Sequence, residues 1–252
     1  VGNGYTKTYG GMAEYGLVVD HQAMLEDGYT VDQLPFYKKF HKFPREMRFE
    51  DGAMLLSLSE SLSAVRNFGV KAGSEVLIFG AGPMGTAVAT YCKLEGAAYV
   101  AIVDNQPARL ENAKRIARVD QTINFDEQPV ADAVGERRFD VAIDAVGATA
   151  VIYQASALLK PYGVVGSMGV LKKNDLLINA SRLKNNTSVH MLNFPFDEYG
   201  AAMDQNIDYI VSGKIDPADF YSHIVPIDEI HEAMELVRTK KALKVILKIA
   251  DQ

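Results

Sequence analysis

The sequence is poor in cysteine, with Cys92 as the single thiol among 252 residues. One thiol excludes an internal disulfide and any zinc cluster built from cysteines. No apolar run approaches the ~20 residues that cross a bilayer. The first residues show no basic segment followed by an apolar core, so we expect no signal peptide. These absences favour a cytoplasmic location and give no reason to expect a membrane partner.

Basic clusters are also missing. The formal net charge is −6, and no basic run exceeds short pairs such as Lys240-Lys241, so nucleic acid is not an expected partner. Apolar residues make up 48% and charged residues 23%, which is ordinary for a globular protein. The chain is long enough for one large domain or two smaller ones with a real core.

Several catalytic motifs are absent. No H-E-x-x-H occurs and the five histidines form no close pair, so we interpret them as structural or exposed rather than as metal ligands. No G-x-S-x-G occurs, which excludes a nucleophile elbow of the esterase type. Asp140 and Asp144 are interpreted as strand-end residues, and Cys92 as a core thiol.

The most informative pattern covers residues 76–104. Four apolar residues, 76–79, predict a strand buried on both faces of a parallel sheet. Gly80, Gly82 and Gly85 then form G-x-G-x-x-G. In this motif the first glycine permits a tight turn, the second lets a pyrophosphate approach the backbone, and the third lets helix and strand pack closely.

A helix is predicted after this turn, and Gly96 is placed to end it in a left-handed cap. A second apolar strand, 99–104, ends in Asp104, about 20 residues after Gly82. A carboxylate there can accept the ribose hydroxyls of an adenosine and would repel the 2′-phosphate of NADP. We therefore predict NAD, against the alternatives of a purely structural turn and a solvated Asp104. The helix should bury the face formed by Met84, Ala87, Val88, Tyr91 and Cys92.

Strands and helices continue to alternate beyond Asp104. Six such strands predict a doubly wound, parallel α/β sheet of the Rossmann type, with partial flanking segments of a catalytic domain. Pro161 and Gly163 are expected to end the predicted helix at 149–159. The predicted helices span about 107–118, a short stretch from 129, 149–159 and 199–211, and the predicted strands span 122–124, 139–147, 164–169 and 188–192.

The flanks of this sheet are less regular. A glycine turn at 9–11 leads into a short predicted strand before residue 20, and a helix is predicted from 49 to 68. Residues 20–42 lack a clear period, so they are a lid, a subunit contact or an irregular surface excursion. Asp228 is expected to cap a helix, and a last strand follows at 245–249. The apolar stripe of that helix would be Ile230, Ala233, Met234 and Val237.

Over about residues 8–250, apart from 20–42, the chain resembles the medium-chain dehydrogenase/reductase family, the zinc-type alcohol and polyol dehydrogenases. The form G-A-G-P-M-G with Asp104 is more similar to the sorbitol and threonine dehydrogenase branch than to the quinone reductases. The matching segments are Gly10-Gly11-Met12-Ala13-Glu14-Tyr15, Phe49-Glu50-Asp51-Gly52-Ala53, Val70-Lys71-Ala72-Gly73, Asp144-Ala145-Val146-Gly147 and Ala242-Leu243-Lys244-Val245-Ile246-Leu247.

The resemblance implies a cofactor site in which Ala145 and Val146 lie along the adenosine and Lys244 reaches the pyrophosphate. It also implies three domain segments: a partial catalytic (GroES-like) segment at 1–58, an NAD-binding Rossmann domain at 59–213, and a return to the catalytic domain at 214–252. Met168, Gly169 and Val170 would line the nicotinamide, and the remaining expected contacts are Gly80, Gly82, Pro83, Met84, Gly85, Asp104, Asn105 and Arg109.

Two departures from the family bear on zinc. The Cys ligand and the Gly-His-Glu segment of the catalytic zinc lie further toward the N-terminus in family members and are not in this sequence. Leu56-Ser57-Leu58-Ser59 stands where the polyol branch has Glu-Pro-Leu-Ser. Zinc is therefore expected for the full-length family, but we predict no zinc ligands in this chain.

The implied reaction is hydride transfer between nicotinamide and a sugar, polyol or other secondary alcohol. We predict this function for a truncated chain that forms a homodimer or homotetramer. One alternative is an NAD-binding, self-associating fragment without catalytic activity. Another is a zinc-independent reductase of the same family, which Asp104 argues against because such enzymes normally carry a residue for the 2′-phosphate there.

Overall fold

The computed structural model describes residue 12 and residues 20–34, 42, 44–192 and 199–249. The strand and glycine turn predicted before residue 20 lie outside these ranges. The chain packs as two compact units, one of Met54–Phe220 and one of Val1–Ala53 with Tyr221–Gln252. The boundaries predicted from the sequence were 58/59 and 213/214. The assignment of the flanks to a catalytic domain remains a prediction.

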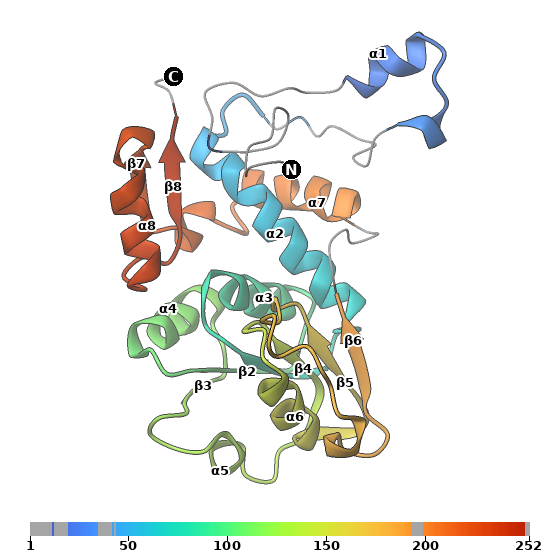
Figure 1. Ribbon diagram of the computed structural model, residues 1–252, viewed down its shortest axis with the longest axis vertical. Helices are drawn as coiled ribbons and strands as arrows, with labels where there is room; N and C mark the ends of the chain where they lie inside the picture. Colours follow the sequence, from blue (N-terminus) through green and yellow to red (C-terminus); the bar gives the residue numbers. More distant parts are fainter. Residues whose placement is uncertain (1–11, 13–19, 35–41, 43, 193–198, 250–252) are drawn as a thin grey trace. The chain divides into compact units, whose positions relative to one another are not determined.

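The larger unit contains a six-stranded sheet in the order β3-β2-β1-β4-β5-β6, with every neighbouring pair parallel (Figure 1). This order confirms the predicted doubly wound Rossmann-type sheet. The strands are β1 (Glu75–Phe79), β2 (Tyr99–Asp104), β3 (Gln121–Asn124), β4 (Phe139–Asp144), β5 (Leu159–Ser167) and β6 (Ser188–Met191).

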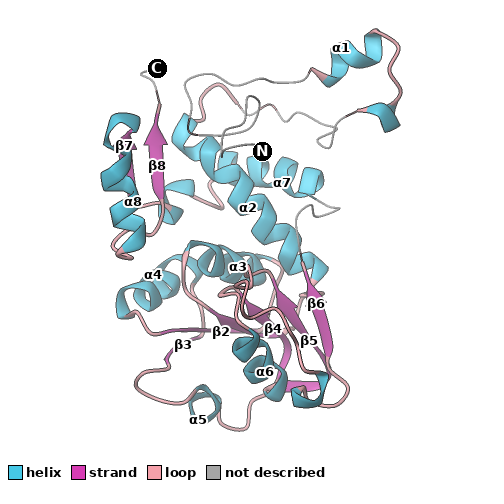
Figure 2. Ribbon diagram, viewed as in Figure 1, coloured by secondary structure: helices cyan, strands magenta, loops and turns pink. Residues whose placement is uncertain are grey.

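Helices connect these strands (Figure 2). Successive strand residues point to opposite faces, so Leu77 and Phe79 join the core cluster that includes Ile152, while Val76 and Ile78 are buried on the other face. Helices α3 and α4 pack against β1–β3, and α6 packs against β4 and β5. The helices are α2 (Phe49–Asn67), α3 (Pro83–Leu94), α4 (Pro107–Ala117), α5 (Val130–Val134), α6 (Thr149–Ala157) and α7 (Tyr199–Val211), with short 3-10 turns η3 (Ala180–Arg182) and η4 (Pro217–Phe220).

Helix α3 ends as predicted. Gly96 has φ +85°, and the next N–H, of Ala97, donates to the Cys92 carbonyl at 2.9 Å, which closes the helix. Cys92 is fully buried, and this burial raises the pKa of its thiol. The interpretation of Cys92 as a core thiol is confirmed.

The end of α6 differs from the prediction. The helix stops at Ala157, and β5 begins at Leu159 rather than at residue 164. Leu159 pairs with Phe139, and the register then shifts before Val164 pairs with Val141. Pro161 lies inside this irregularity, where its missing N–H removes no regular ladder bond. Proline and glycine here mark a bulge within a strand, not the end of a helix.

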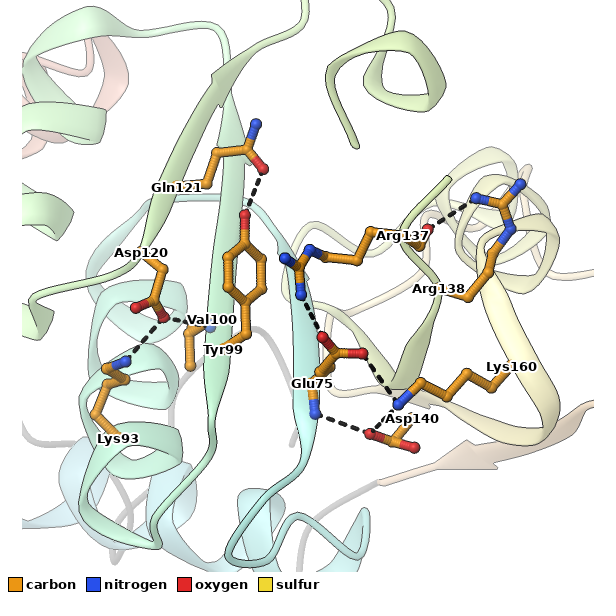
Figure 3. A network of polar contacts seen from close by, with 10 residues as sticks. All are labelled: Glu75, Lys93, Tyr99, Val100, Asp120, Gln121, Arg137, Arg138, Asp140 and Lys160. Atoms are coloured by element: carbon orange, nitrogen blue, oxygen red, sulfur yellow. Dashed lines mark hydrogen bonds and ion pairs between the residues drawn. The ribbon is translucent and has the colours of Figure 1, made fainter. Parts of the chain in front are cut away.

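A polar network joins the amino ends of the strands (Figure 3). Glu75 forms ion pairs with Arg137 and with Lys160, and Lys160 also pairs with Asp140 at 2.9 Å. The Arg137 guanidinium lies 3.8 Å from the centre of the Tyr99 ring. Starting residues of β1, β2, β4 and β5 are thus linked by charge at this edge of the sheet.

The smaller unit contains a two-stranded parallel sheet of β7 (His223–Pro226) and β8 (Val245–Lys248), with α8 (Ile230–Arg238) packed against both. Strand β7 was not predicted. Asp228 does not cap α8, because it lies in the 3-10 turn η5 (Ile227–Glu229) and Glu229 occupies the cap position. Of the predicted apolar stripe, Ala233 is buried while Met234 and Val237 are exposed.

Within residues 20–42, the described residues 20–34 contain helix. Helix α1 (His21–Glu26) is capped by the Asp20 carboxylate, which accepts from the N–H groups of Gln22 and Ala23. A 3-10 turn, η2 (Val31–Gln33), follows. The stretch is therefore not wholly irregular, and whether it acts as a lid or a subunit contact stays a prediction. Within the described ranges no helix combines the length and apolar character needed to cross a membrane.

Candidate functional site

The glycine turn between β1 and α3 is held by close packing. A Cβ atom on Gly85 would lie 1.8 Å from the carbonyl oxygen of Gly80, so any other residue would push the helix away from the strand. The Gly80 N–H donates to the Val103 carbonyl at 2.7 Å, which ties the turn to β2. Glycine at 85 therefore has the packing role that its position in the motif predicts.

Gly82 has the opposite surroundings. It occupies the N-cap position of α3, and a Cβ atom there would meet only the Arg109 guanidinium, at 3.9 Å. The first-turn N–H groups of a helix have no intrahelical acceptor, and the helix dipole favours negative charge at this end. Open space, free backbone donors and a guanidinium make a cradle that fits a phosphate diester.

Asp104 ends β2 beside this turn and is only 8% exposed. One carboxylate oxygen, Oδ2, accepts the Ala81 N–H at 2.8 Å, while Oδ1 accepts the N–H groups of Asn105 and Gln106 at 2.9 and 3.0 Å. A carboxylate has about four lone-pair sites. Oδ2 therefore retains capacity for one more donor, such as a hydroxyl, and the same side chain stiffens the glycine turn.

Asp144 is a residue of this edge whose importance sequence reasoning missed. It was interpreted as a strand-end residue, yet its side chain is completely buried. Its Oδ1 accepts the N–H groups of Val146 and Gly147, both at 2.9 Å, and its Oδ2 accepts the Ser167 hydroxyl at 2.9 Å. The available signal was the sequence D-x-x-G directly after a run of buried strand residues.

The loops after β4 and β5 approach each other closely. A Cβ on Gly147 would lie 2.3 Å from the Val170 carbonyl oxygen, and a Cβ on Gly169 would lie 2.0 Å from the Gly147 nitrogen. The N–H groups of Met168 and Gly169 both donate to the Asp144 carbonyl. Val170 is 89% exposed above this contact, so the interlocked loops present side chains to solvent.

The structure brings most of the predicted site residues to one edge of the sheet. They follow the carboxyl ends of β1, β2, β4 and β5, on both sides of the β1–β4 boundary where the strand order reverses, which is where doubly wound sheets bind ligands. Lys244 belongs to the other unit, so its predicted contact stays a prediction. The residues at the edge are Gly80, Gly82, Pro83, Met84, Gly85, Asp104, Asn105, Arg109, Ala145, Val146, Met168, Gly169 and Val170.

Zinc does not fit the described residues. They contain no group of three or more His, Cys, Asp or Glu side chains that could hold a metal ion. Leu56, at the position where a carboxylate would stand in the polyol branch, lies half exposed on α2 and offers no ligand atom. No step of the proposed reaction is assigned to zinc.

A parallel sheet in the order 3-2-1-4-5-6, with a glycine turn and a helix N-terminus at its reversal point, defines the Rossmann class of α/β domains. Residues 83–206 match the family model described as "Zinc-binding dehydrogenase". This part of the chain is therefore similar to the zinc-type dehydrogenases, the family that the sequence motifs indicated.

Relatives and solved structures agree with this placement. The chain is 28% identical over 232 residues to a probable D-xylulose reductase A of Aspergillus clavatus, covering 88% of this chain and 63% of that protein. It is 29% identical over 249 residues to an alcohol dehydrogenase of Cupriavidus necator, covering 95% and 63%. The chain thus spans about three fifths of the length of these relatives.

Two solved structures share the fold. An alcohol dehydrogenase from a Thermus species superposes with a TM-score of 0.73 at 24% identity, covering 83% of this chain and 61% of that chain. A short chain alcohol dehydrogenase from E. coli, solved in complex with the cofactor NADH, also gives a TM-score of 0.73, at 20% identity and with 83% and 62% covered. At these identities the likeness supports the fold alone.

Proposed function

We propose that this chain is the cofactor-binding part of an NAD-dependent oxidoreductase that transfers a hydride between nicotinamide and a sugar, polyol or other secondary alcohol. The observation that carries the proposal is the open cradle at Gly82, in front of the α3 N-terminus and beside Arg109. The similarity to a probable D-xylulose reductase and to an alcohol dehydrogenase supports the substrate class.

The chain's own residues would bind and orient the cofactor. The pyrophosphate accepts hydrogen bonds from the first turn of α3, with Arg109 adding charge. The remaining acceptor capacity of Asp104 Oδ2 takes a ribose hydroxyl, and the carboxylate repels a 2′-phosphate. The loops at Val146 and at Met168–Val170 cover the adenosine and nicotinamide halves, as the family resemblance implies.

The bound nicotinamide supplies the redox chemistry. When bound, NAD would accept a hydride from the alcohol carbon while the alcohol oxygen releases a proton, so that the products would be a carbonyl compound, NADH and a proton. We assign no residue of this chain to the proton transfer. We also propose that the protein forms a homodimer or homotetramer, that it lies in the cytoplasm and that its substrate is a small alcohol.

Calorimetric titration with NAD and NADP tests the cofactor assignment, and equal affinities would contradict it. Turnover is then assayed as NADH formation over a panel of polyols and secondary alcohols, together with elemental analysis for zinc after dialysis. NAD binding without turnover by this chain would favour the binding-only alternative. Reduction of enones with NADPH would favour the zinc-independent reductase.

A further inference from the structure

Asp144 is a buried carboxylate that pairs with no cation of the part of the chain that the structure describes. Among the described residues no Lys, Arg or His forms an ion pair with it, although its side chain is completely buried. Burying a charge is unfavourable unless the charged atoms are hydrogen-bonded. Here the compensation comes from two backbone N–H groups and one hydroxyl, so the side chain and its donors constrain one another.

These donors come from two different loops. Oδ1 holds the loop after β4 through the N–H groups of Val146 and Gly147, and Oδ2 holds the end of β5 through the Ser167 hydroxyl. Oδ2 and Oδ1 belong to one rigid planar group. The carboxylate therefore fixes the position of one loop relative to the other.

The two loops are packed so closely that they cannot approach each other further. The backbone contacts between Gly147, Gly169 and Val170 leave no room even for a methyl group. If the carboxylate were removed, the N–H groups of Val146 and Gly147 would lose their acceptor, which is unfavourable, above all for the buried Gly147 N–H. The loops would relieve this by moving toward water, and their exposed side chains would move with them.

We propose that Asp144 is a positioning residue for the cofactor: it holds the loop after β5, which is expected to line the nicotinamide half of NAD, in place against the loop after β4, which is expected to line the adenosine half. This inference rests on the proposed function, because it assumes that the two loops line the cofactor. It assigns no contact between Asp144 and the cofactor itself. The side chain acts through Val146, Gly147 and Ser167.

Three variants separate positioning from charge and from general stability. Asp144→Ala removes all three side-chain hydrogen bonds. Asp144→Asn keeps them, because its carbonyl oxygen can accept the two N–H groups while its amide donates to the Ser167 hydroxyl. Ser167→Ala removes only the bond that holds the end of β5. Ser61→Ala is the matched control, since Ser61 is a buried serine on α2 that also donates a hydrogen bond.

The measurement is the dissociation constant for NADH and for ADP-ribose, which lacks the nicotinamide, with thermal melting as a check on folding. We expect Asp144→Ala to weaken NADH by about 100-fold and ADP-ribose by about tenfold or less, and Asp144→Asn to stay within about threefold of the parent for both. Ser167→Ala should weaken NADH by about fivefold, with ADP-ribose unchanged. Ser61→Ala should change neither.

Equal losses for the two ligands in Asp144→Ala, or an Asp144→Asn variant as weak as Asp144→Ala, would overturn the inference. If Asp144→Ala does not fold, the Ser167→Ala and Asp144→Asn variants test the inference instead. A Ser167→Ala variant that loses the same affinity for NADH as for ADP-ribose would also contradict the inference. If the parent chain binds neither ligand, the proposed function itself fails, and this outcome is distinct from an unselective loss in the variants.

Discussion

At the amino ends of the strands, Glu75, Asp120 and Asp140 are partly exposed and each forms an ion pair with a lysine or an arginine (Figure 3). At the carboxyl ends, Asp104 and Asp144 are buried and accept hydrogen bonds from backbone N–H groups. Both edges carry acidic residues at the ends of strands. Cationic side chains pair with the carboxylates at the amino edge, whereas backbone N–H groups donate to the carboxylates at the carboxyl edge.

The difference distinguishes an edge held together by ion pairs from the edge that we propose binds the cofactor. Exposed ion pairs contribute about 0–1 kcal/mol each and place side chains across the strand ends. A buried carboxylate that accepts backbone N–H groups instead fixes the conformation of the turn that follows. At the carboxyl edge the acidic side chains thus shape loops, and the space in front of α3 stays open at Gly82.

The largest expected effect comes from the glycine turn. Gly85→Val should destabilise the fold by more than about 4 kcal/mol, because its side chain would overlap with the Gly80 carbonyl oxygen.

Gly82→Val should leave the fold intact and abolish NAD-induced thermal stabilisation, because its side chain fills the cradle. Thermal melting with and without NAD checks both. A Gly82→Val variant that gains stability from NAD like the parent would mean that the turn is structural only.

The next effect concerns cofactor choice at Asp104. We expect NAD to bind at least about tenfold tighter than NADP, or about 1.4 kcal/mol. Asp104→Ser with Asn105→Arg should narrow or reverse this ratio, measured by calorimetry. Because Asp104 also accepts the Ala81 N–H, both affinities should fall in this variant, so the ratio is the informative quantity. Asp104→Asn alone is the control for the turn, and an unchanged ratio in the double variant would contradict the assignment.

A third prediction concerns the lateral edge of the sheet. Among the described strands, β6 is last in the order and pairs with β5 alone, which makes its outer side a candidate contact for a symmetric partner. Val189→Pro should give monomers or insoluble protein, whereas Val189→Thr, which keeps the N–H and the branched side chain, should behave like the parent. Sedimentation velocity measures this. An unchanged profile for the proline variant would remove β6 from the interface.

The smallest effect is expected at the amino edge. Burial raises the pKa of the Asp140 carboxyl, but the Glu75 N–H and the Lys160 ammonium outweigh it and hold the pKa below its ordinary value. Because the pKa is lower in the folded state, the Asp140 carboxylate stabilises the fold at pH values above the pKa of the unfolded chain, about 3.9. This stabilisation is lost as the pH falls through the pKa of the folded state.

Lys160→Met should therefore flatten the decline in unfolding free energy below about pH 4. At neutral pH it should cost less than about 1 kcal/mol, because both partners are more than a third exposed. NAD affinity should not change. Denaturant unfolding at several pH values measures the unfolding free energy and its pH dependence. Calorimetry measures the affinity for NAD. A loss of cofactor affinity in Lys160→Met would contradict the separation of the two edges.

Local patterns were sufficient for the six strands of the larger sheet, apart from the start of β5, and for the glycine turn and the helix that follows it. The apolar run at residues 76–79 is a buried strand as predicted, and Pro107 marked the first turn of α4 as predicted. The same local rules were wrong at Pro161 and at Asp228. There, pairing of Leu159 with Phe139 and a 3-10 turn before α8 overrode the usual meaning of proline and of a capping residue.

By itself the sequence determined the class of sheet and the position of the cradle, because burial periodicity and glycine spacing are properties of neighbouring residues. Only the tertiary structure decided that Asp104 and Asp144 are buried and that the β4 and β5 loops interlock at Gly147 and Gly169. An aspartate at the end of a strand is equally compatible with solvent and with a buried carboxylate. Which one occurs depends on the donors within about 3 Å: N–H groups of the turn that follows the aspartate, together with the Ala81 N–H or the Ser167 hydroxyl from a neighbouring part of the sheet.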